Sequence, residues 1–273
     1  MMKTSFSTLA CPDWSLTEVL RAAAAYGYDG VELRVISREL DLWNLTEFKS
    51  PSLAATRVAI EDHGLLIASV GSSACFHSPH AGVRERNLES AQRMAEIAAG
   101  LGAPSIRVFG DRIQPGSERK QTIAWIVDSL ARLTNKLKPS NVKVLLETHG
   151  DFATASDVSE ILAQVNSAEI GIIWDPANAF AQDNEPPLIL PQMSSRIHHV
   201  HLKDLKRAGN GSFDYMLTGE GGFPSEVMLG SLAGIGYDGF VSFEWEKFWH
   251  PELAAPEVAL PHFIRWWKSR EAV

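Results

Sequence analysis

The sequence is poor in the features that mark secreted and membrane proteins. Only two cysteines occur among its 273 residues, Cys11 and Cys75, and they form no CxxC pair. Two such cysteines exclude a disulfide scaffold and favour a reducing compartment. No apolar run approaches the roughly 18 residues of a membrane span, and the first ten residues lack the apolar core of a signal peptide. We therefore expect a cytoplasmic protein without a membrane partner.

Basic residues are also fewer than acidic ones. The chain has 25 Lys and Arg and 33 Asp and Glu, which gives a formal net charge of −8. General nucleic-acid binding needs a basic footprint, so DNA and RNA are not expected partners. A glycine-rich GxGxxG turn, the mark of a dinucleotide fold, is absent too. The chain does contain 45% hydrophobic residues, enough for a large core, and it has no low-complexity segment. We expect one domain spanning residues 1–273.

Strand and helix patterns alternate along the whole chain. Strands are expected at residues 3–10, 29–35, 65–73, 105–110, 142–150, 170–178, 197–204 and 239–246. Helices are expected at 15–27, 50–64, 83–102, 117–138, 154–165, 224–236 and 255–270, with a Pro-rich connection at 184–193 and a long Gly-containing loop before the helix at 224. Such alternation means parallel strands with crossover helices, and eight units in this length predict a (β/α)8 TIM barrel. A doubly wound open sheet is the alternative.

Four successive strands have an apolar outer face and a polar residue on the inner face near the C-terminal end. These inner residues are Glu147, Asp175, His201 and Glu244. TIM-barrel active sites lie at that end, so the four side chains should converge. Three carboxylates in one place repel one another and stay ionised only if a cation compensates. Three oxygen donors and one imidazole suit Mn²⁺ first, with Mg²⁺ or Co²⁺ as alternatives.

Other inner-face residues have more than one interpretation. Glu246 shares a face with Glu244, so either glutamate could be the metal ligand. Arg34 and Arg107 could be ion-pair partners inside the barrel or clamps for a substrate. His199 is expected to be buried beside the ligands. A single acidic residue at a strand end is usually solvated or caps a helix, so only the joint position of the four residues favours a site.

Five segments, LLETHG, IIWDPAN, HVHLKD, TGEGGFP and GYDGFVSFEWEK, make the chain resemble the sugar isomerase/epimerase superfamily with its xylose isomerase-like TIM barrel. The segment from Thr8 to Arg34 resembles the opening of that family. The resemblance implies that one divalent metal is held by Glu147, Asp175, His201 and Glu244, and that the two glutamates serve as acid and base on a bound sugar. Substrate contacts are expected from Glu32, His149, Asn178, Lys203, Arg207 and Glu246. Many relatives have His where this chain has Asn178.

The expected reaction is proton transfer beside the carbonyl of a ketose, an aldose or a related polyol-ketone, through a metal-stabilised enediolate. Return of the proton to the same carbon gives an epimerase, and return to the neighbouring carbon gives an isomerase. Loss of a β-hydroxyl would instead give a dehydratase of a cyclic or open-chain keto-polyol, similar to inosose dehydratase.

Two further alternatives remain, an apurinic endonuclease-like protein with three zinc ions and a non-catalytic sugar-binding protein. The inner arginines argue against the endonuclease, because they would repel zinc. Trp266 and Trp267 in the last helix are expected to pack against the barrel or against a partner subunit of a homo-oligomer.

Overall fold

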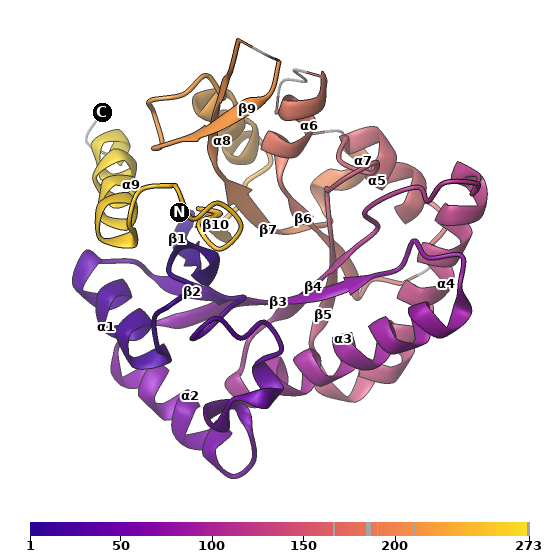
Figure 1. Ribbon diagram of the computed structural model, residues 1–273, viewed down its shortest axis with the longest axis horizontal. Coiled ribbons are helices and arrows are strands. Elements are labelled where there is room, and N and C mark those ends of the chain that lie inside the picture. Colours follow the sequence, from indigo (N-terminus) through magenta and orange to yellow (C-terminus); the bar gives the residue numbers. More distant parts are fainter. Residues whose placement is uncertain (166, 184–186, 190, 210, 272–273) are drawn as a thin grey trace.

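Eight parallel strands close into a barrel in the order β1-β10-β7-β6-β5-β4-β3-β2 (Figure 1). The computed structural model describes residues 1–165, 167–183, 187–189, 191–209 and 211–271. The strands are β1 (Lys3–Ser7), β2 (Gly30–Leu33), β3 (Leu66–Cys75), β4 (Ser105–Phe109), β5 (Lys143–Glu147), β6 (Ile170–Trp174), β7 (Ile197–Leu202) and β10 (Phe240–Phe243), together with β8 (Asp204–Arg207) and β9 (Phe213–Met216) outside the barrel. The predicted (β/α)8 barrel is confirmed.

The helices surround the barrel (Figure 1). They are α1 (Leu16–Tyr26), α2 (Ser52–Asp62), α3 (Ala81–Leu101), α4 (Arg119–Leu137), α5 (Ala155–Leu162), α6 (Pro176–Asp183), α7 (Pro191–Ser194), α8 (Ser225–Gly234) and α9 (Pro256–Glu271), with 3-10 turns at 8–10, 42–44, 46–48 and 138–140. Helix α1 shows why the sequence folds this way. A capping box of Ser15 and Glu18 begins it, and Gly27, with a φ of 84°, ends it in the left-handed region.

One hydrophobic layer lies between the barrel strands and the helices. It contains the side chains that the alternation predicts on the outer face, each at most 2% exposed: Val144, Leu146, Ile172, Trp174, Val200, Leu202, Val241 and Phe243. Burial of one such side chain contributes roughly 1.5–3 kcal/mol, so this layer holds the strands rigidly and fixes the direction of their inner faces. No helix within the described ranges has the length and apolar character needed to cross a bilayer.

Most of the barrel strands end earlier than the sequence predicts, and β5 and β6 matter most for the site. Strand β5 stops at Glu147, although residues up to 150 were expected, and β6 stops at Trp174, although residues up to 178 were expected. Asp175 explains the second difference, because its Oδ1 accepts hydrogen bonds from the backbone nitrogens of Ala177 (3.1 Å) and Asn178 (3.3 Å) and starts α6. Residues 184–186 and 190 of the expected Pro-rich connection lie outside the described residues.

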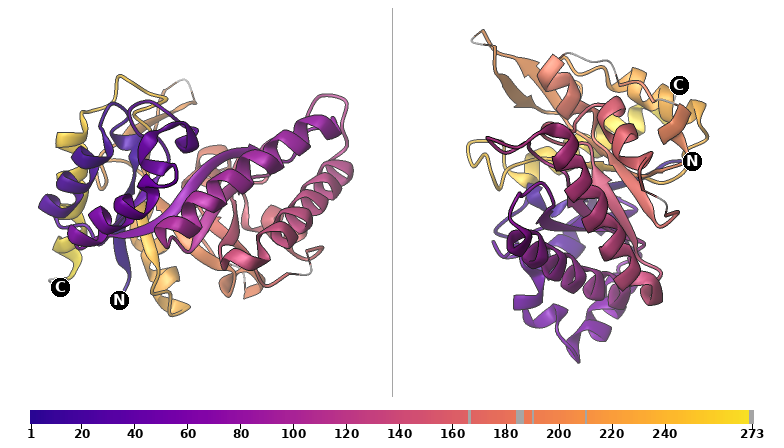
Figure 2. Two further views of the ribbon diagram at one scale, coloured as in Figure 1. Left: turned by 90° about the horizontal axis from the view of Figure 1, so that it is seen from below. Right: turned by 90° about the vertical axis from the view of Figure 1, so that its right-hand side faces the viewer.

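The loop expected before α8 contains an antiparallel hairpin of β8 and β9. Figure 2 shows this hairpin at the end of the barrel opposite the two termini. The carboxylate of Asp204 accepts hydrogen bonds from the backbone nitrogens of Gly219 (2.8 Å), Gly221 (3.0 Å) and Phe223 (3.0 Å). A Cβ at Gly221 would lie only 2.2 Å from Oδ1 of Asp204. The last residue of the IHHVHLKD segment therefore holds the TGEGGFP segment in place.

Candidate active site

The four side chains predicted to bind a metal come together at the C-terminal ends of four neighbouring strands. Glu147 ends β5, Asp175 follows β6, His201 lies in β7 and Glu244 follows β10. One potential ligand atom from each lies within 4.8 Å of the others, and all four residues are buried. Glu246 is not in this group, so the geometry favours Glu244 as the ligand of the two glutamates.

The distances around His201 fit a cation site. Its Nδ1 lies 3.3 Å from Oε1 of Glu244 and 3.6 Å from Oδ2 of Asp175. Oε2 of Glu147 lies 3.9 Å from the same nitrogen. Neither Nδ1 of His201 nor Oε2 of Glu147 makes a hydrogen bond within the described part of the chain. A buried imidazole nitrogen facing three carboxylate oxygens is a donor set that suits Mn²⁺, Mg²⁺ or Zn²⁺.

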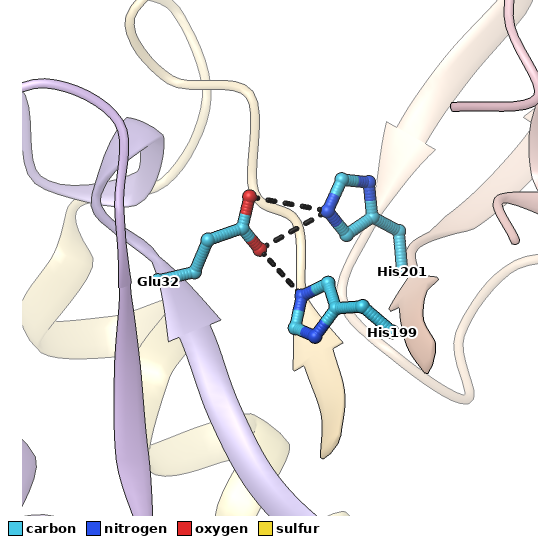
Figure 3. A group of neighbouring side chains, drawn as sticks. All are labelled: Glu32, His199 and His201. Atoms are coloured by element: carbon cyan, nitrogen blue, oxygen red, sulfur yellow. Dashed lines mark hydrogen bonds and ion pairs between the residues drawn. The ribbon is translucent and has the colours of Figure 1, made fainter. Parts of the chain in front are cut away.

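A buried carboxylate on β2 fixes the orientation of this imidazole. Figure 3 shows the rings of His199 and His201 directed at Glu32. Oε2 of Glu32 lies 2.9 Å from Nε2 of His199 and 3.0 Å from Nε2 of His201. Burial alone would raise the pKa of Glu32, but the two histidines outweigh it and hold that pKa well below its usual range. A proton on Nε2 of His201 leaves the lone pair of Nδ1 toward the carboxylates, as metal-binding histidines require.

Two buried cations of the chain itself approach the same carboxylates. Nη1 of Arg107 lies 3.1 Å from Oε2 of Glu147 and 3.7 Å from Oε1 of Glu244. Nζ of Lys203 lies 2.8 Å from Oδ2 of Asp175 and 2.7 Å from Oε2 of Glu244. A metal ion is therefore not the only charge that lets the carboxylates coexist, which corrects the electrostatic argument made from the sequence. Arg107 is an ion-pair partner inside the barrel.

The carboxylates differ in how readily they take a proton. Burial alone would raise the pKa of Asp175, but Lys203 and His201 outweigh it and lower that pKa to about 2. Burial raises the pKa of Glu147, and the opposing effect of Arg107 does not cancel it. Of these two carboxylates, Glu147 is therefore the better suited to exchange a proton with a substrate near neutral pH.

A pocket of about 470 Å³ opens at this cluster. Glu147 and Glu244 line it, together with three of the residues predicted to contact substrate, His149, Lys203 and Glu246. Oε1 of Glu246 accepts a hydrogen bond of 2.8 Å from Nζ of Lys203. These five side chains can reach a ligand directly, so the pocket unites two of the four proposed metal ligands with groups able to bind hydroxyls.

The other three predicted substrate contacts do not line this pocket. Glu32 is completely buried, and its carboxylate contacts the imidazole of His201. The Nδ2 of Asn178 donates to the backbone oxygen of Thr148 at 2.9 Å, which ties α6 to the end of β5. Arg207 lies on the β8–β9 hairpin, where its guanidinium is 4.5 Å from the centre of the Phe213 ring.

The sequence interpretation missed a group beside His149. Asp111 follows β4 with a φ of 65°, and its Oδ1 lies 3.1 Å from Nδ1 of His149. Burial alone would lower the pKa of His149, but the hydrogen bond to Asp111 and the charge of Glu147 outweigh it and raise that pKa. Cys75 and His77 lie near the same aspartate. The only signal in the sequence is an acidic residue two positions after a strand, which is too common to single out.

The fold and the position of the polar cluster define a TIM barrel of the kind that carries its site at the C-terminal strand ends. The family model described as "xylose isomerase-like TIM barrel" matches residues 20–270, and the chain belongs to this family. The 3-dehydroshikimate dehydratase of Pseudomonas aeruginosa is 24% identical over 251 residues, which cover 89% of this chain and 38% of that protein. The chain spans about two fifths of the length of the curated relatives that it matches.

Solved structures share the fold at low sequence identity. The 3-keto-D-glucoside 4-epimerase YcjR from E. coli superposes with a TM-score of 0.77 at 18% identity, covering 98% of this chain and 100% of its own. The IolI protein with a bound zinc atom has a TM-score of 0.77 at 19% identity, covering 96% of this chain and 95% of its own. The similar proteins thus include an epimerase and a dehydratase on the same barrel.

Proposed function

We propose that the protein is a divalent-metal-dependent isomerase or epimerase of a sugar or related keto-polyol. The observation that carries this proposal is the convergence of Glu147, Asp175, His201 and Glu244 within 4.8 Å, with the two glutamates lining a pocket. These four residues would hold the ion, with Mn²⁺ as the expected metal. When bound, the ion supplies Lewis acidity to the carbonyl and the adjacent hydroxyl of the substrate.

Two glutamates carry the proton in this proposal. Glu147, whose pKa burial raises, takes the proton from the carbon beside the carbonyl. Glu244 receives a hydrogen bond of 2.7 Å from Lys203, which can hold it on the other side of the substrate. Delivery of a proton by Glu244 to the opposite face of the original carbon inverts that carbon. Delivery of a proton to the neighbouring carbonyl carbon, with transfer of the hydroxyl proton to the former carbonyl oxygen, moves the carbonyl instead. Lys203 and Glu246 line the pocket where substrate hydroxyls would bind.

Dehydration is the second candidate function, and the contact between His149 and Asp111 favours it. Glu147 would take the proton from the carbon, and the electron pair of that C–H bond would form a C=C bond. The hydroxyl on the next carbon would leave with a proton from His149, so the balanced product is water. The raised pKa of His149 suits an acid in this step. The dehydratase from Pseudomonas aeruginosa supports this alternative.

The test is a substrate panel in D2O with Mn²⁺-loaded protein, followed by NMR. Deuterium at the carbon beside the carbonyl, with a new epimer or isomer, is expected for the first function, whereas water loss with a conjugated product indicates dehydration. Glu147→Gln should reduce the rates of both reactions by at least about 100-fold, which is the lower end of the rate contribution expected from a general base. Most Mn²⁺ binding should remain, because three ligands and the amide oxygen are kept.

Glu160→Gln is the matched control, since this glutamate is half-exposed and pairs with Arg119 on the outside of the barrel. It should leave turnover and Mn²⁺ affinity unchanged. Retained turnover in a clean preparation of Glu147→Gln would refute the assignment of the base. Absence of Mn²⁺ binding by the wild-type protein would refute the metal site.

A further inference from the structure

Arg34, the residue after β2, is a buried cation with most of its donors unused. Its exposed fraction is 4%, and Nη2 donates to Oγ of Ser73 at 2.7 Å. Nε and Nη1 make no hydrogen bond, and no carboxylate oxygen lies within 4.0 Å among the residues that the structure describes. An arginine taken out of water normally has its donors satisfied by an anion or by carbonyl oxygens. Arg34 lacks such partners.

A second arginine, Arg107, lies close to Arg34 and increases the electrostatic cost of burying its charge. A Cβ at Gly71, on the strand between β2 and β4, would lie 2.7 Å from Cδ of Arg34 and 3.4 Å from Nη2 of Arg107. The two cationic side chains thus share the space above a residue that has no side chain. Burial and the charge of Arg107 lower the pKa of Arg34 to about 9. Arg107 is paired with Glu147, whereas Arg34 pairs with no carboxylate in the part of the chain that the structure describes.

Arg34 belongs to the wall of the candidate active site, although its Nε and Nη1 are themselves closed to solvent. Arg34, Ser73 and Arg107 line the same pocket as Glu147 and Glu244. They come from β2, β3 and β4, on the part of the ring that does not supply the metal ligands. A ligand that touches the acidic cluster with one end can therefore place another end on the exposed Ser73 and the neighbouring Arg34.

We propose that Arg34 and Ser73 bind a carboxylate group of the substrate. The inference rests on the proposed function, since it places the remainder of that substrate at the metal ligands. A guanidinium group and a hydroxyl 2.7 Å from its Nη2 together match the two oxygens of a carboxylate. A phosphate dianion would need further donors, and the other two arginines of this pocket already face carboxylates, Arg107 that of Glu147 and Arg112 that of Asp111. The substrate class is therefore a keto-polyol acid.

Binding of two matched pairs of compounds tests this inference without any turnover. The pairs are 3-dehydroshikimate with its methyl ester, and D-glucuronate with D-glucose, with inorganic phosphate as a separate probe. Affinities are measured by calorimetry on Mn²⁺-loaded protein and on metal-free protein. At least one acid should bind about tenfold or more tightly than its neutral partner, as charge-assisted hydrogen bonds predict.

Arg34→Met keeps the length of the side chain and removes its charge, so it should bring the acid-to-neutral ratio close to one. Ser73→Ala, a smaller change, should lower the ratio by a few-fold and guards against misfolding of the first variant. Arg57→Met is the control, because Arg57 lies on α2 with 51% exposure and pairs with Glu61. Mn²⁺ affinity should stay the same in all three variants.

Several results would overturn the inference. These are equal or absent binding of acid and neutral partner by the wild-type protein, an unchanged ratio in Arg34→Met and Ser73→Ala, or Arg34-dependent binding of phosphate without binding of the acids. The proposed function fails separately, if Mn²⁺ does not bind while the acid-to-neutral ratio persists. A bound ion together with a ratio of one would refute the carboxylate site alone.

Discussion

Replacement of Lys203 by Met should destabilise the metal-free protein strongly. The ammonium group lies 2.8 Å from Asp175, 2.7 Å from Glu244 and 2.8 Å from Glu246, and the side chain is 3% exposed. Burial alone would lower the pKa of Lys203, but these carboxylates outweigh it and raise that pKa well above its usual range. Methionine fills a similar volume without the charge, so the variant isolates the electrostatic contribution.

Loss of one partner from a buried ion pair costs about 3–5 kcal/mol, because the remaining charge stays buried and unpaired. At roughly 2–4 °C per kcal/mol for a domain of this size, Tm should fall by about 6–20 °C. Mn²⁺ at 100 times its Kd should stabilise the wild-type protein by about 2.7 kcal/mol. The ion should stabilise Lys203→Met by more than this, because it restores positive charge among the same carboxylates.

The assay is calorimetric unfolding with and without Mn²⁺, beside the control Lys136→Met. Lys136 is 40% exposed and lies 3.9 Å from Glu85, so its loss should cost less than about 1 kcal/mol. The reasoning is refuted if Lys203→Met is as stable as this control. It is also refuted if Mn²⁺ protects the variant no more than the wild-type protein.

Two further predictions concern other parts of the fold. Asp204→Asn removes the negative charge that accepts hydrogen bonds from three backbone N–H groups, and urea unfolding should show that the free energy of unfolding falls by about 2–3 kcal/mol. The control is Asp13→Asn, which removes an exposed ion pair expected to contribute under about 1 kcal/mol. A loss for Asp204→Asn no larger than that of the control would contradict the prediction. Burial raises the pKa of Cys75 to about 12 and that of Cys11 well above its usual value, so iodoacetamide should alkylate both slowly at pH 8 and faster as pH rises. Rapid alkylation at pH 8 would contradict this prediction.

The barrel and the convergence of the four proposed ligands could be predicted, because the alternation of strand residues indicates both the fold and the inward-facing side chains. A residue such as Val144 faces the helices, and the period of two then directs Glu147 inward. Sequence order also places neighbouring strands side by side in such a barrel, so four inner residues at strand ends must converge. These arguments need only local periodicity and topology, which the sequence contains.

Contacts between side chains far apart in the sequence could not be predicted from the sequence, because they depend on side-chain conformation. Glu32 was expected at the substrate, yet it extends across the barrel to His199 and His201, which lie 167 and 169 positions further along the chain. The pairing of Lys203 with three carboxylates and the contact of Asp111 with His149 depend on rotamers and on loop conformation. The hairpin of β8 and β9 was also missed, because its glycine-containing sequence resembles an ordinary loop.

Gly71 couples the substitutions that are possible at positions 34, 71 and 107. Because its side chain is a single hydrogen atom, Arg34 and Arg107 from the flanking strands can occupy neighbouring space over the same face of β3. A lineage that keeps both arginines has no freedom at position 71, whereas one that loses an arginine could accept alanine or serine there. Covariation among these three positions in homologous chains would therefore separate members that handle charged ligands from those that handle neutral ones.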